Sequence, residues 1–303
     1  MAEAAPGSGG TVWLASYPKS GSTWLRMFVR NLLADGERPA DINAGDGEPI
    51  ASHRPWLDGV LGIASADLLP AELERLRPRA YDWPAPSTAP SAAPSLRKIH
   101  DAYSVADDGS PLAGRGAGRR AVYIVRNPLA VAVSYAHHRD CSVDEAIDLM
   151  ADPEHALAGD AEGVRGQVRQ RLHSWSGHVR SWTGAPGLDL HLLRYEDMAL
   201  QPGRAFRGVA RFLGLPFDVA RVAKAVRFAG FDELARQETH QGFRERVSAN
   251  SRFFRSGRVD GWREVLTPAQ VHRIVEQHAP TMARLGYLDG PQARRPRRAA
   301  VPA

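Results

Sequence analysis

Cysteine is almost absent from this sequence, whose 303 residues include only Cys141. A chain with one cysteine cannot build an internal disulfide framework, and such a chain suits a reducing compartment. Long hydrophobic runs are absent too, since no stretch approaches the roughly 18 uninterrupted apolar residues of a membrane span. Residues 1–10 lack the basic and apolar regions of a signal peptide. These absences predict a cytoplasmic protein that does not contact a membrane.

An excess of one charge is confined to the C-terminal end. The formal net charge is +5, and four arginines of a Pro/Ala-rich tail supply most of it: Arg294, Arg295, Arg297 and Arg298. Without them the net charge falls to +1, which is too even for a protein body that binds nucleic acid. We therefore expect no nucleic-acid partner. We also expect residues 1–10 and 290–303 to be disordered, on either side of one domain at 11–289.

Groups of histidines and carboxylates at metal-ligand spacing are missing as well, so the sequence predicts no metal site. With 43% hydrophobic and 24% charged residues, the chain can bury an ordinary core. Short apolar runs alternate with amphipathic helical patterns. This alternation predicts an α/β fold, a single domain with a mostly parallel central sheet and helices on both faces. Ligands of such sheets bind at the carboxyl ends of the strands.

The most informative segment is YPKSGSTW, residues 17–24. Before it, residues 11–15 have the short apolar character of a buried strand, and after it apolar residues recur at helical spacing. A strand, a glycine-containing turn and a helix aim free backbone N–H groups and a helix dipole at an anion. The alternative is a tight turn with a surface lysine, which would not require a strand before it and a helix after it. The segment predicts a P-loop-like cradle for phosphate or sulfate.

This loop departs from the Walker pattern, because Lys19 precedes Gly21 instead of following a second glycine. It resembles the 5′-phosphosulfate loop of the cytosolic-type sulfotransferases, which use 3′-phosphoadenosine 5′-phosphosulfate (PAPS) as donor. The resemblance implies that backbone N–H groups here bind the 5′-phosphate and that an aromatic face meets the adenine. The implied donor-binding residues are Lys19, Ser20, Gly21, Ser22, Thr23 and Trp24.

A second segment, LRKIH at 96–100, has the character of a strand. Alternation would place Lys98 and His100 on one face while Ile99 points into the core. The segment resembles the family's Lys-Thr-His strand, whose histidine is the catalytic base and whose lysine contacts the transferred group. A lone histidine at a strand end is more often structural, but its position between two nucleotide-binding segments favours catalysis.

A third segment, 121–138, runs from an apolar strand into Arg126, and Asn127-Pro128 then begins a helix. Arginine at the end of a strand suits a terminal phosphate, since its planar fork donates two charge-assisted hydrogen bonds. The alternative is an arginine that merely caps the strand. The segment is similar to the family's 3′-phosphate strand and helix, with Arg126 and Ser134 at the matching positions.

The remaining donor-binding residues lie in three shorter segments. LHLLRYEDM, 190–198, reads as a strand ending in Tyr195, and the resemblance implies that this tyrosine approaches the adenine, as does Phe231 in AGFDEL. RFFRSGRVDGW, 252–262, is similar to the family's Arg-Lys-Gly loop over the 3′-phosphate. It departs from that pattern, with Ser256 where lysine is usual and Asp-Gly inverted before the tryptophan. The residues implied from this loop are Arg255, Ser256 and Gly257.

The resemblance implies an enzyme that moves a sulfuryl group from PAPS to a hydroxyl of a small-molecule acceptor. The implied catalytic residues are His100 as general base, with Lys19 and Lys98 meeting the developing charge. Two alternatives stay open. A P-loop kinase would need Lys-Ser/Thr after the glycine and an acidic Mg²⁺ ligand, and a non-catalytic nucleotide-binding protein would need neither Lys19 nor His100.

No motif identifies the acceptor or the oligomeric state. The abundance of Ala, Arg, Gly and Pro, with resemblance around 180–184 and 193–198, favours a bacterial enzyme of natural-product biosynthesis. We expect 83–95 and 151–165 to be acceptor-site lids, tolerated surface insertions being the alternative. His137 and His138 cannot both face one site on a helix, and we interpret them as surface or acceptor-pocket residues. Ser142 with Glu145 and Thr267 with Gln270 predict capped helix starts.

Overall fold

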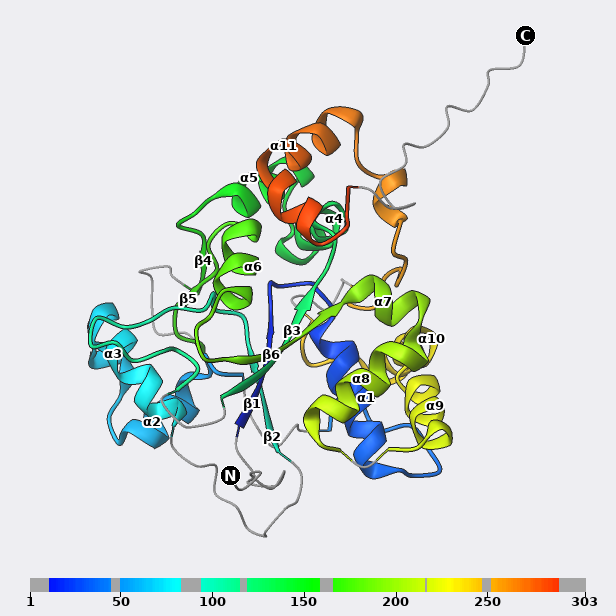
Figure 1. Ribbon diagram of the computed structural model, residues 1–303, viewed down its shortest axis with the longest axis horizontal. Coiled ribbons are helices and arrows are strands. Elements are labelled where there is room, and N and C mark those ends of the chain that lie inside the picture. The colour runs from blue at the N-terminus through cyan, green and yellow to red at the C-terminus, as the bar shows by residue number, and fades with distance from the viewer. Residues whose placement is uncertain are drawn as a thin grey trace, which may run out of the picture.

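The computed structural model describes residues 11–44, 50–82, 94–114, 119–158, 166–215, 217–246 and 252–288. Its main sheet has four parallel strands in the spatial order β2–β1–β3–β6. These are β1 (Thr11–Ser16), β2 (Ser95–Ile99), β3 (Arg120–Val125) and β6 (Asp189–Arg194). A short antiparallel pair joins β4 (Ala156–Leu157) to β5 (Gln170–Arg171). The parallel central sheet predicted from the sequence is confirmed (Figure 1).

Both faces of the sheet are buried, because side chains alternate along each strand. Trp13 and Ala15 pack into one core, while Val12 and Leu14 pack into the other. Figure 1 shows α2 and α3 on one side of the strands and α1, α8, α9 and α10 on the other.

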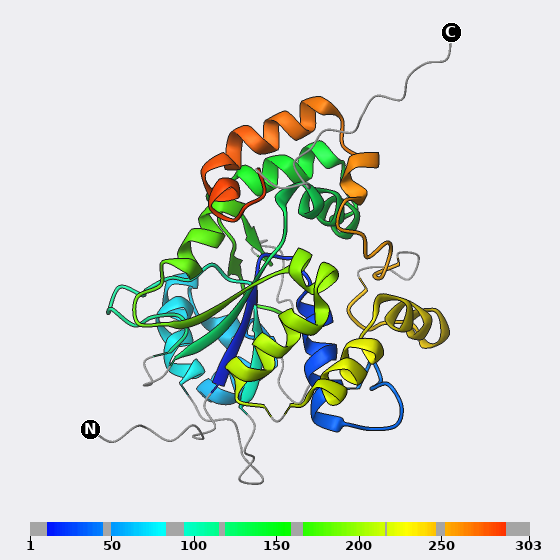
Figure 2. The same cartoon turned by 45° about the vertical axis from the view of Figure 1, so that its right-hand side comes forward.

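The helices divide between the two cores. The first core contains residues of α2 (Arg54–Leu61), α3 (Pro70–Tyr81), α4 (Pro128–Arg139), α5 (Val143–Ala151), α6 (Trp175–Thr183) and α11 (Pro268–Arg284). The second contains residues of α1 (Ser22–Ala34), α7 (Tyr195–Leu200), α8 (Pro202–Leu213), α9 (Val219–Phe228) and α10 (Phe231–Gln241). The described residues also form two 3-10 turns, η1 (Ser65–Asp67) and η2 (Gly261–Glu264). Figure 2, turned from the first view, shows α11 lying along α4 and α5.

The predicted helix starts are confirmed. The Ser142 side chain accepts from the Glu145 N–H, and the Glu145 carboxylate accepts from the Ser142 N–H, which is a capping box. Thr267 and Gln270 make the same reciprocal pair at the start of α11.

One predicted boundary is wrong: Tyr195 is the first residue of α7 and not the end of a strand, since β6 ends at Arg194. Glu196 and Asp197 follow in the first helical turn, where carboxylates interact favourably with the helix dipole. As the first residue of α7, Tyr195 lies with its ring against Gly21 in the loop that follows β1.

Other predictions fall partly outside the described residues. The N-terminal residues 1–10, the tail 290–303, and most of the predicted lid at 83–95 lie there. The predicted lid at 151–165 is described only as far as 158, and its described part contains β4. Two residues are too few for an alternating pattern to reveal a strand. The disordered ends and both lids stay predictions. None of the described helices is both long and apolar enough to cross a bilayer.

Candidate active site

A cavity of about 940 Å³ opens at the carboxyl ends of β1, β2 and β3. All but one of the site residues predicted from the sequence line it, and the exception is Ser20, whose side chain is buried below. The structure therefore brings together segments that are more than 200 residues apart in the chain. The lining residues among those predicted are Lys19, Gly21, Ser22, Thr23, Trp24, Lys98, His100, Arg126, Ser134, Tyr195, Phe231, Arg255, Ser256 and Gly257.

The loop after β1 has the backbone shape of an anion cradle. Lys19 and Gly21 have φ values of 68° and 108°, which belong to the left-handed region. A Cβ on Gly21 would lie 2.8 Å from the Tyr195 ring, so only glycine fits there. Helix α1 then begins at Ser22 without a side-chain cap, which leaves its first N–H groups available to an anion.

Lys19 enters the cavity from the mouth of this loop. Its Nζ lies 4.0 Å from the centre of the Phe253 ring, and its carbonyl accepts a hydrogen bond from Arg126 Nη1 at 3.1 Å. Burial, followed by the charges of Lys98 and Arg126, lowers the pKa of Lys19 to about 8. The ammonium is therefore still charged at neutral pH, and it would lose its proton in mildly alkaline solution.

We predict that the affinity for 3′-phosphoadenosine 5′-phosphate (PAP) falls as pH rises through about 8. An anion binds the protonated lysine, and Lys19 is protonated below that pKa and neutral above it, so each pH unit above it costs up to about tenfold in binding constant. Calorimetric titrations at several pH values on either side of this pKa check it. Lys19→Arg stays charged, so the PAP affinity of this variant should not fall above pH 8. If its affinity fell with pH as that of the wild type does, the assignment of the fall to Lys19 would be wrong.

His100 directly follows β2, and Lys98 precedes it on the same face, as the sequence predicts. The His100 Nδ1 atom lies 2.8 Å from the Ser16 carbonyl oxygen. Because a carbonyl oxygen only accepts, Nδ1 carries the proton and Nε2 keeps its lone pair. Burial and the neighbouring charge of Lys98 hold the pKa of His100 well below 6.5. The imidazole is therefore neutral at pH 7 and carries its proton on Nδ1.

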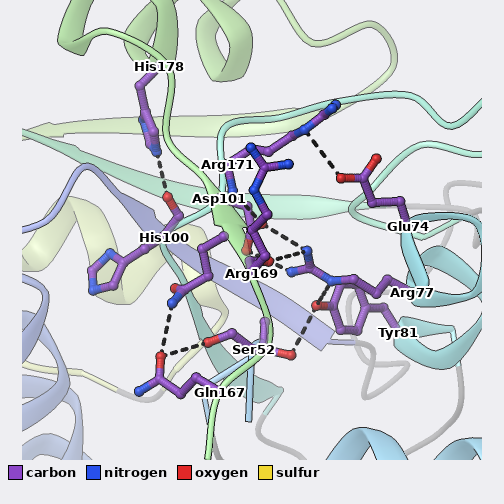
Figure 3. Close-up of polar contacts among 12 residues, drawn as sticks. Ser52, Glu74, Arg77, Tyr81, His100, Asp101, Gln167, Arg169, Arg171 and His178 are labelled. Atoms are coloured by element: carbon purple, nitrogen blue, oxygen red, sulfur yellow. Dashed lines mark hydrogen bonds and ion pairs between the residues drawn. The ribbon is translucent and has the colours of Figure 1, made fainter. Parts of the chain in front are cut away.

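The backbone at His100 is fixed from behind by buried groups (Figure 3). His178 Nε2 donates to the His100 carbonyl at 2.9 Å, and the Tyr123 hydroxyl donates to His178 Nδ1 at 2.8 Å. Burial lowers the pKa of His178 to about 4, so its ring is neutral and can donate from one nitrogen while accepting at the other. This chain of hydrogen bonds fixes the direction in which the His100 side chain leaves the strand.

Asp101, the next residue, anchors the same strand end. Its two carboxylate oxygens accept from Arg77 Nη1 at 2.9 Å and Nη2 at 2.7 Å, a bidentate pair buried on both sides. Its backbone carbonyl accepts from Trp182 Nε1 at 2.9 Å. Figure 3 shows Arg77 and His178 reaching the strand end from different elements. The sequence analysis did not identify these supports, because each joins positions far apart in the chain.

Glu245 is the main site residue that the sequence analysis missed. Its carboxylate lies 3.2 Å from Lys98 Nζ and also pairs with Arg26. Burial alone would raise the pKa of Glu245, but the charges of Lys98 and Arg26 outweigh it and lower the pKa to about 2. The residue belongs to no motif, and nothing in its neighbouring sequence indicates that it faces Lys98. The ionised Glu245 carboxylate is therefore paired with Lys98, the lysine that the family resemblance assigns to the transferred group.

We predict that Glu245→Gln tightens the binding of PAPS by about three- to tenfold, since it removes a negative charge beside Lys98. Dissociation constants measured in a binding assay without acceptor check it, with the exposed Glu276→Gln on α11 as the matched control. Weaker donor binding in Glu245→Gln would instead mean that the carboxylate holds Lys98 in place.

The opposite end of the cavity gathers the residues predicted to bind the 3′-phosphate and the adenine. The Arg126 guanidinium lies 4.1 Å from the centre of the Tyr195 ring, and the Tyr195 hydroxyl donates to the Gly257 carbonyl at 3.1 Å. Gly257 has φ 62°, and a Cβ there would lie 2.6 Å from the Phe231 ring. Loop 255–257 thus contacts both Tyr195 and Phe231 through Gly257. The loop can therefore close over the cavity with Ser256 at the position where the family has a lysine.

Two donors in this half have no hydrogen-bond partner among the described residues: Arg126 Nε and Trp24 Nε1. Buried polar groups are normally hydrogen-bonded, so these groups are suited to a ligand that accepts. Together with the positive charges at Lys19 and Arg126, they fit a nucleotide with phosphate groups at both ends. In the described part of the chain, no group of three His, Cys, Asp or Glu side chains could hold a metal ion.

The two histidines of α4 separate as the sequence predicts. His137 is exposed, while His138 lines the cavity. Burial and the charges of Lys19 and Lys98 lower the pKa of His138 to about 4, so it is neutral at pH 7.

Comparisons with known proteins agree with this site. The family model described as "Sulfotransferase domain" matches residues 10–286. Cytosolic sulfotransferase 1 of Arabidopsis thaliana is 25% identical, over 86% of this chain and 75% of its own length. Sulfotransferase 1B1 of Mus musculus is 26% identical, over 88% of this chain and 80% of its own length.

Two solved structures share the fold. Mouse sulfotransferase SULT7A1, complexed with PAP, has a TM-score of 0.53 at 21% identity and covers 90% of this chain and 84% of its own. Retinol dehydratase, in complex with androsterone and PAP, has a TM-score of 0.56 at 18% identity and covers 90% and 80%. Because the family match runs from the strand before the loop to the end of α11, the chain belongs to the sulfotransferase family and is a PAPS-dependent transferase.

Proposed function

We propose that the protein transfers the sulfuryl group of PAPS to a hydroxyl of a small-molecule acceptor, giving a sulfate ester and PAP. The observation that carries the proposal is the position of His100. Its neutral ring, with Nδ1 bound to the Ser16 carbonyl, lies beside Lys98 in the same cavity as the anion cradle. A base and an anion site in one cavity are the two requirements of sulfuryl transfer.

In the proposed mechanism, His100 Nε2 removes the proton of the acceptor hydroxyl as that oxygen bonds to sulfur. The bond between sulfur and the bridging oxygen breaks in the same in-line step. Lys19 meets the negative charge that grows on the leaving phosphate, and Lys98, released from Glu245, meets the sulfuryl oxygens. PAPS supplies the activated sulfuryl group, so the protein's own task is to position it and to move one proton.

The proposed donor contacts use both halves of the cradle. Backbone N–H groups of residues 20–23 bind the 5′-phosphate, while Arg126, Ser134 and loop 255–257 bind the 3′-phosphate. The aromatic residues Trp24, Tyr195 and Phe231 surround the adenine. The Arg126 Nε and Trp24 Nε1 atoms, which have no hydrogen-bond partner in the described segments, support this placement.

The setting of the reaction is also a proposal. We assign the protein to the cytoplasm of a bacterium and its acceptor to natural-product biosynthesis. The single cysteine and the composition of the chain support this assignment.

Calorimetry tests the donor. The protein should bind PAP at least about tenfold more tightly than ADP with Mg²⁺, because Arg126 and loop 255–257 meet a 3′-phosphate that ADP lacks. A transfer assay with labelled PAPS over a panel of hydroxyl acceptors tests the reaction. Tighter binding of ADP with Mg²⁺ would instead indicate a kinase, and PAP binding without any transfer would indicate a binding protein.

A further inference from the structure

One wall of the cavity is lined by residues that the sequence does not assign to the donor. Its lining comes from the end of α4, from β4 and β5, and from the chain before α2. Six of its residues are Ile50, Tyr135, His138, Leu157, Gln167 and Gln170. Four of these six, Tyr135, His138, Gln167 and Gln170, carry a hydrogen-bonding side chain.

Strand β5 brings Gln170 to the side of the proposed base. The Arg171 N–H donates to Asp101 Oδ1 at 3.2 Å, and the Ala102 N–H donates to the Arg171 carbonyl at 2.7 Å. Neighbouring side chains of a strand point in opposite directions. Arg171 pairs with Glu74 at 3.2 Å outside the cavity, and Gln170 accordingly faces inward. Figure 3 shows Arg171 and Asp101 in contact, directly beside His100.

The amide of Gln170 is only half satisfied. The residue is 1% exposed, and its Nε2 donates to Gln167 Oε1 at 2.9 Å. Gln167 Oε1 also accepts from the Ser52 hydroxyl at 3.1 Å, and this second hydrogen bond fixes the position of the two amides. Gln170 Oε1 is buried and has no hydrogen-bond partner in the described part of the chain. A buried carbonyl oxygen that belongs to a cavity-lining residue and lacks a donor is suited to a donor on the ligand.

We infer that the acceptor is polyhydroxylated, with one hydroxyl reacting at His100 and a second donating to Gln170 Oε1. The inference rests on the proposed sulfuryl transfer and names its acceptor class. The exposed amide of Gln167 and the neutral ring of His138 extend the polar wall for further hydroxyls. A sugar or glycoside and a polyphenol share this chemistry, and the experiment separates them.

The test compares acceptors whose second hydroxyl is free with analogues in which it is methylated or removed. Resorcinol against 3-methoxyphenol forms the polyphenol arm, and phenyl β-D-glucoside against its monodeoxy analogues forms the glycoside arm. In one arm, loss of the second hydroxyl should lower kcat/KM by about tenfold or more, because the site's buried acceptor is left unpaired. Gln170→Met should abolish that difference, because the variant presents no buried carbonyl oxygen to either member of a pair. An equal effect of Gln170→Met on both members of each pair would overturn the inference.

Binding measurements keep this test independent of turnover. Calorimetry of each acceptor with the wild-type protein saturated with PAP should show the same preference for the second hydroxyl. A protein that binds PAP and prefers the hydroxylated acceptor, but transfers nothing, would refute the proposed reaction and leave the acceptor class supported. A protein that sulfates resorcinol and 3-methoxyphenol equally, and the glucosides equally, would refute the acceptor class alone.

Discussion

His100→Ala should lower the rate of sulfuryl transfer by about 10²–10⁴-fold, the usual cost of removing a general base. The loss should appear in kcat, because His100 Nε2 acts on the acceptor's proton and not on the nucleotide. PAP should still bind with near-normal affinity, since the cradle of residues 19–24 and Arg126 remain in place. Steady-state kinetics with labelled PAPS, together with calorimetry with PAP, measure the two quantities.

The matched control for this variant is His191→Ala. His191 belongs to β6 and stacks on Phe212, outside the cavity lining. Near-normal turnover in His100→Ala would show that another group takes the proton. Loss of PAP binding along with turnover would indicate that the substitution loosens the strand end, where His100 Nδ1 holds the Ser16 carbonyl.

Arg126→Ala should weaken PAPS binding by about 10²-fold, because a guanidinium makes two charge-assisted hydrogen bonds to a phosphate. Adenosine 5′-phosphosulfate lacks the 3′-phosphate, so its binding should weaken far less. The ratio of the two dissociation constants is the informative quantity. Arg126 also donates to the Lys19 carbonyl, and loosening of that loop would affect both nucleotides alike.

Arg120→Ala is the control at the other end of the same strand, where the arginine pairs with Asp189 at 3.4 Å. It should leave both dissociation constants close to those of the wild type. If Arg126→Ala weakened PAPS and adenosine 5′-phosphosulfate to the same extent, the 3′-phosphate role of Arg126 would be wrong.

Local patterns in the sequence were enough for the main elements of the site. The apolar run before YPKSGSTW and the helical spacing after it predicted β1, the cradle and α1. Alternation along β2 predicted that Lys98 and His100 share a face, and both line the cavity. Asn127-Pro128 predicted the start of α4. Each of these features depends on backbone geometry within a few residues, which is why a single sequence carries it.

Contacts across the fold were beyond the reach of the sequence. Tyr195 reads as a strand residue from its apolar neighbours, but it begins α7, and its ring closes on Gly21. Glu245 reads as one charge in an arginine-rich stretch, and only packing brings it to Lys98. The half-satisfied amide of Gln170 depends on a two-residue strand that no periodicity could reveal.

By itself, the sequence determined where an anion cradle and a phosphate-binding arginine could lie, because strand and helix periods fix where neighbouring side chains point. The role of His100 as the base came from the resemblance to the sulfotransferases. The tertiary structure decided the states of those residues. The Ser16 carbonyl, 84 residues away along the chain, sets which nitrogen of His100 is basic. Burial, together with the charges of Lys98 and Arg126, lowers the pKa of Lys19 to about 8. Protonation and tautomer depend on burial and on neighbouring charges, and only the folded chain brings those charges together.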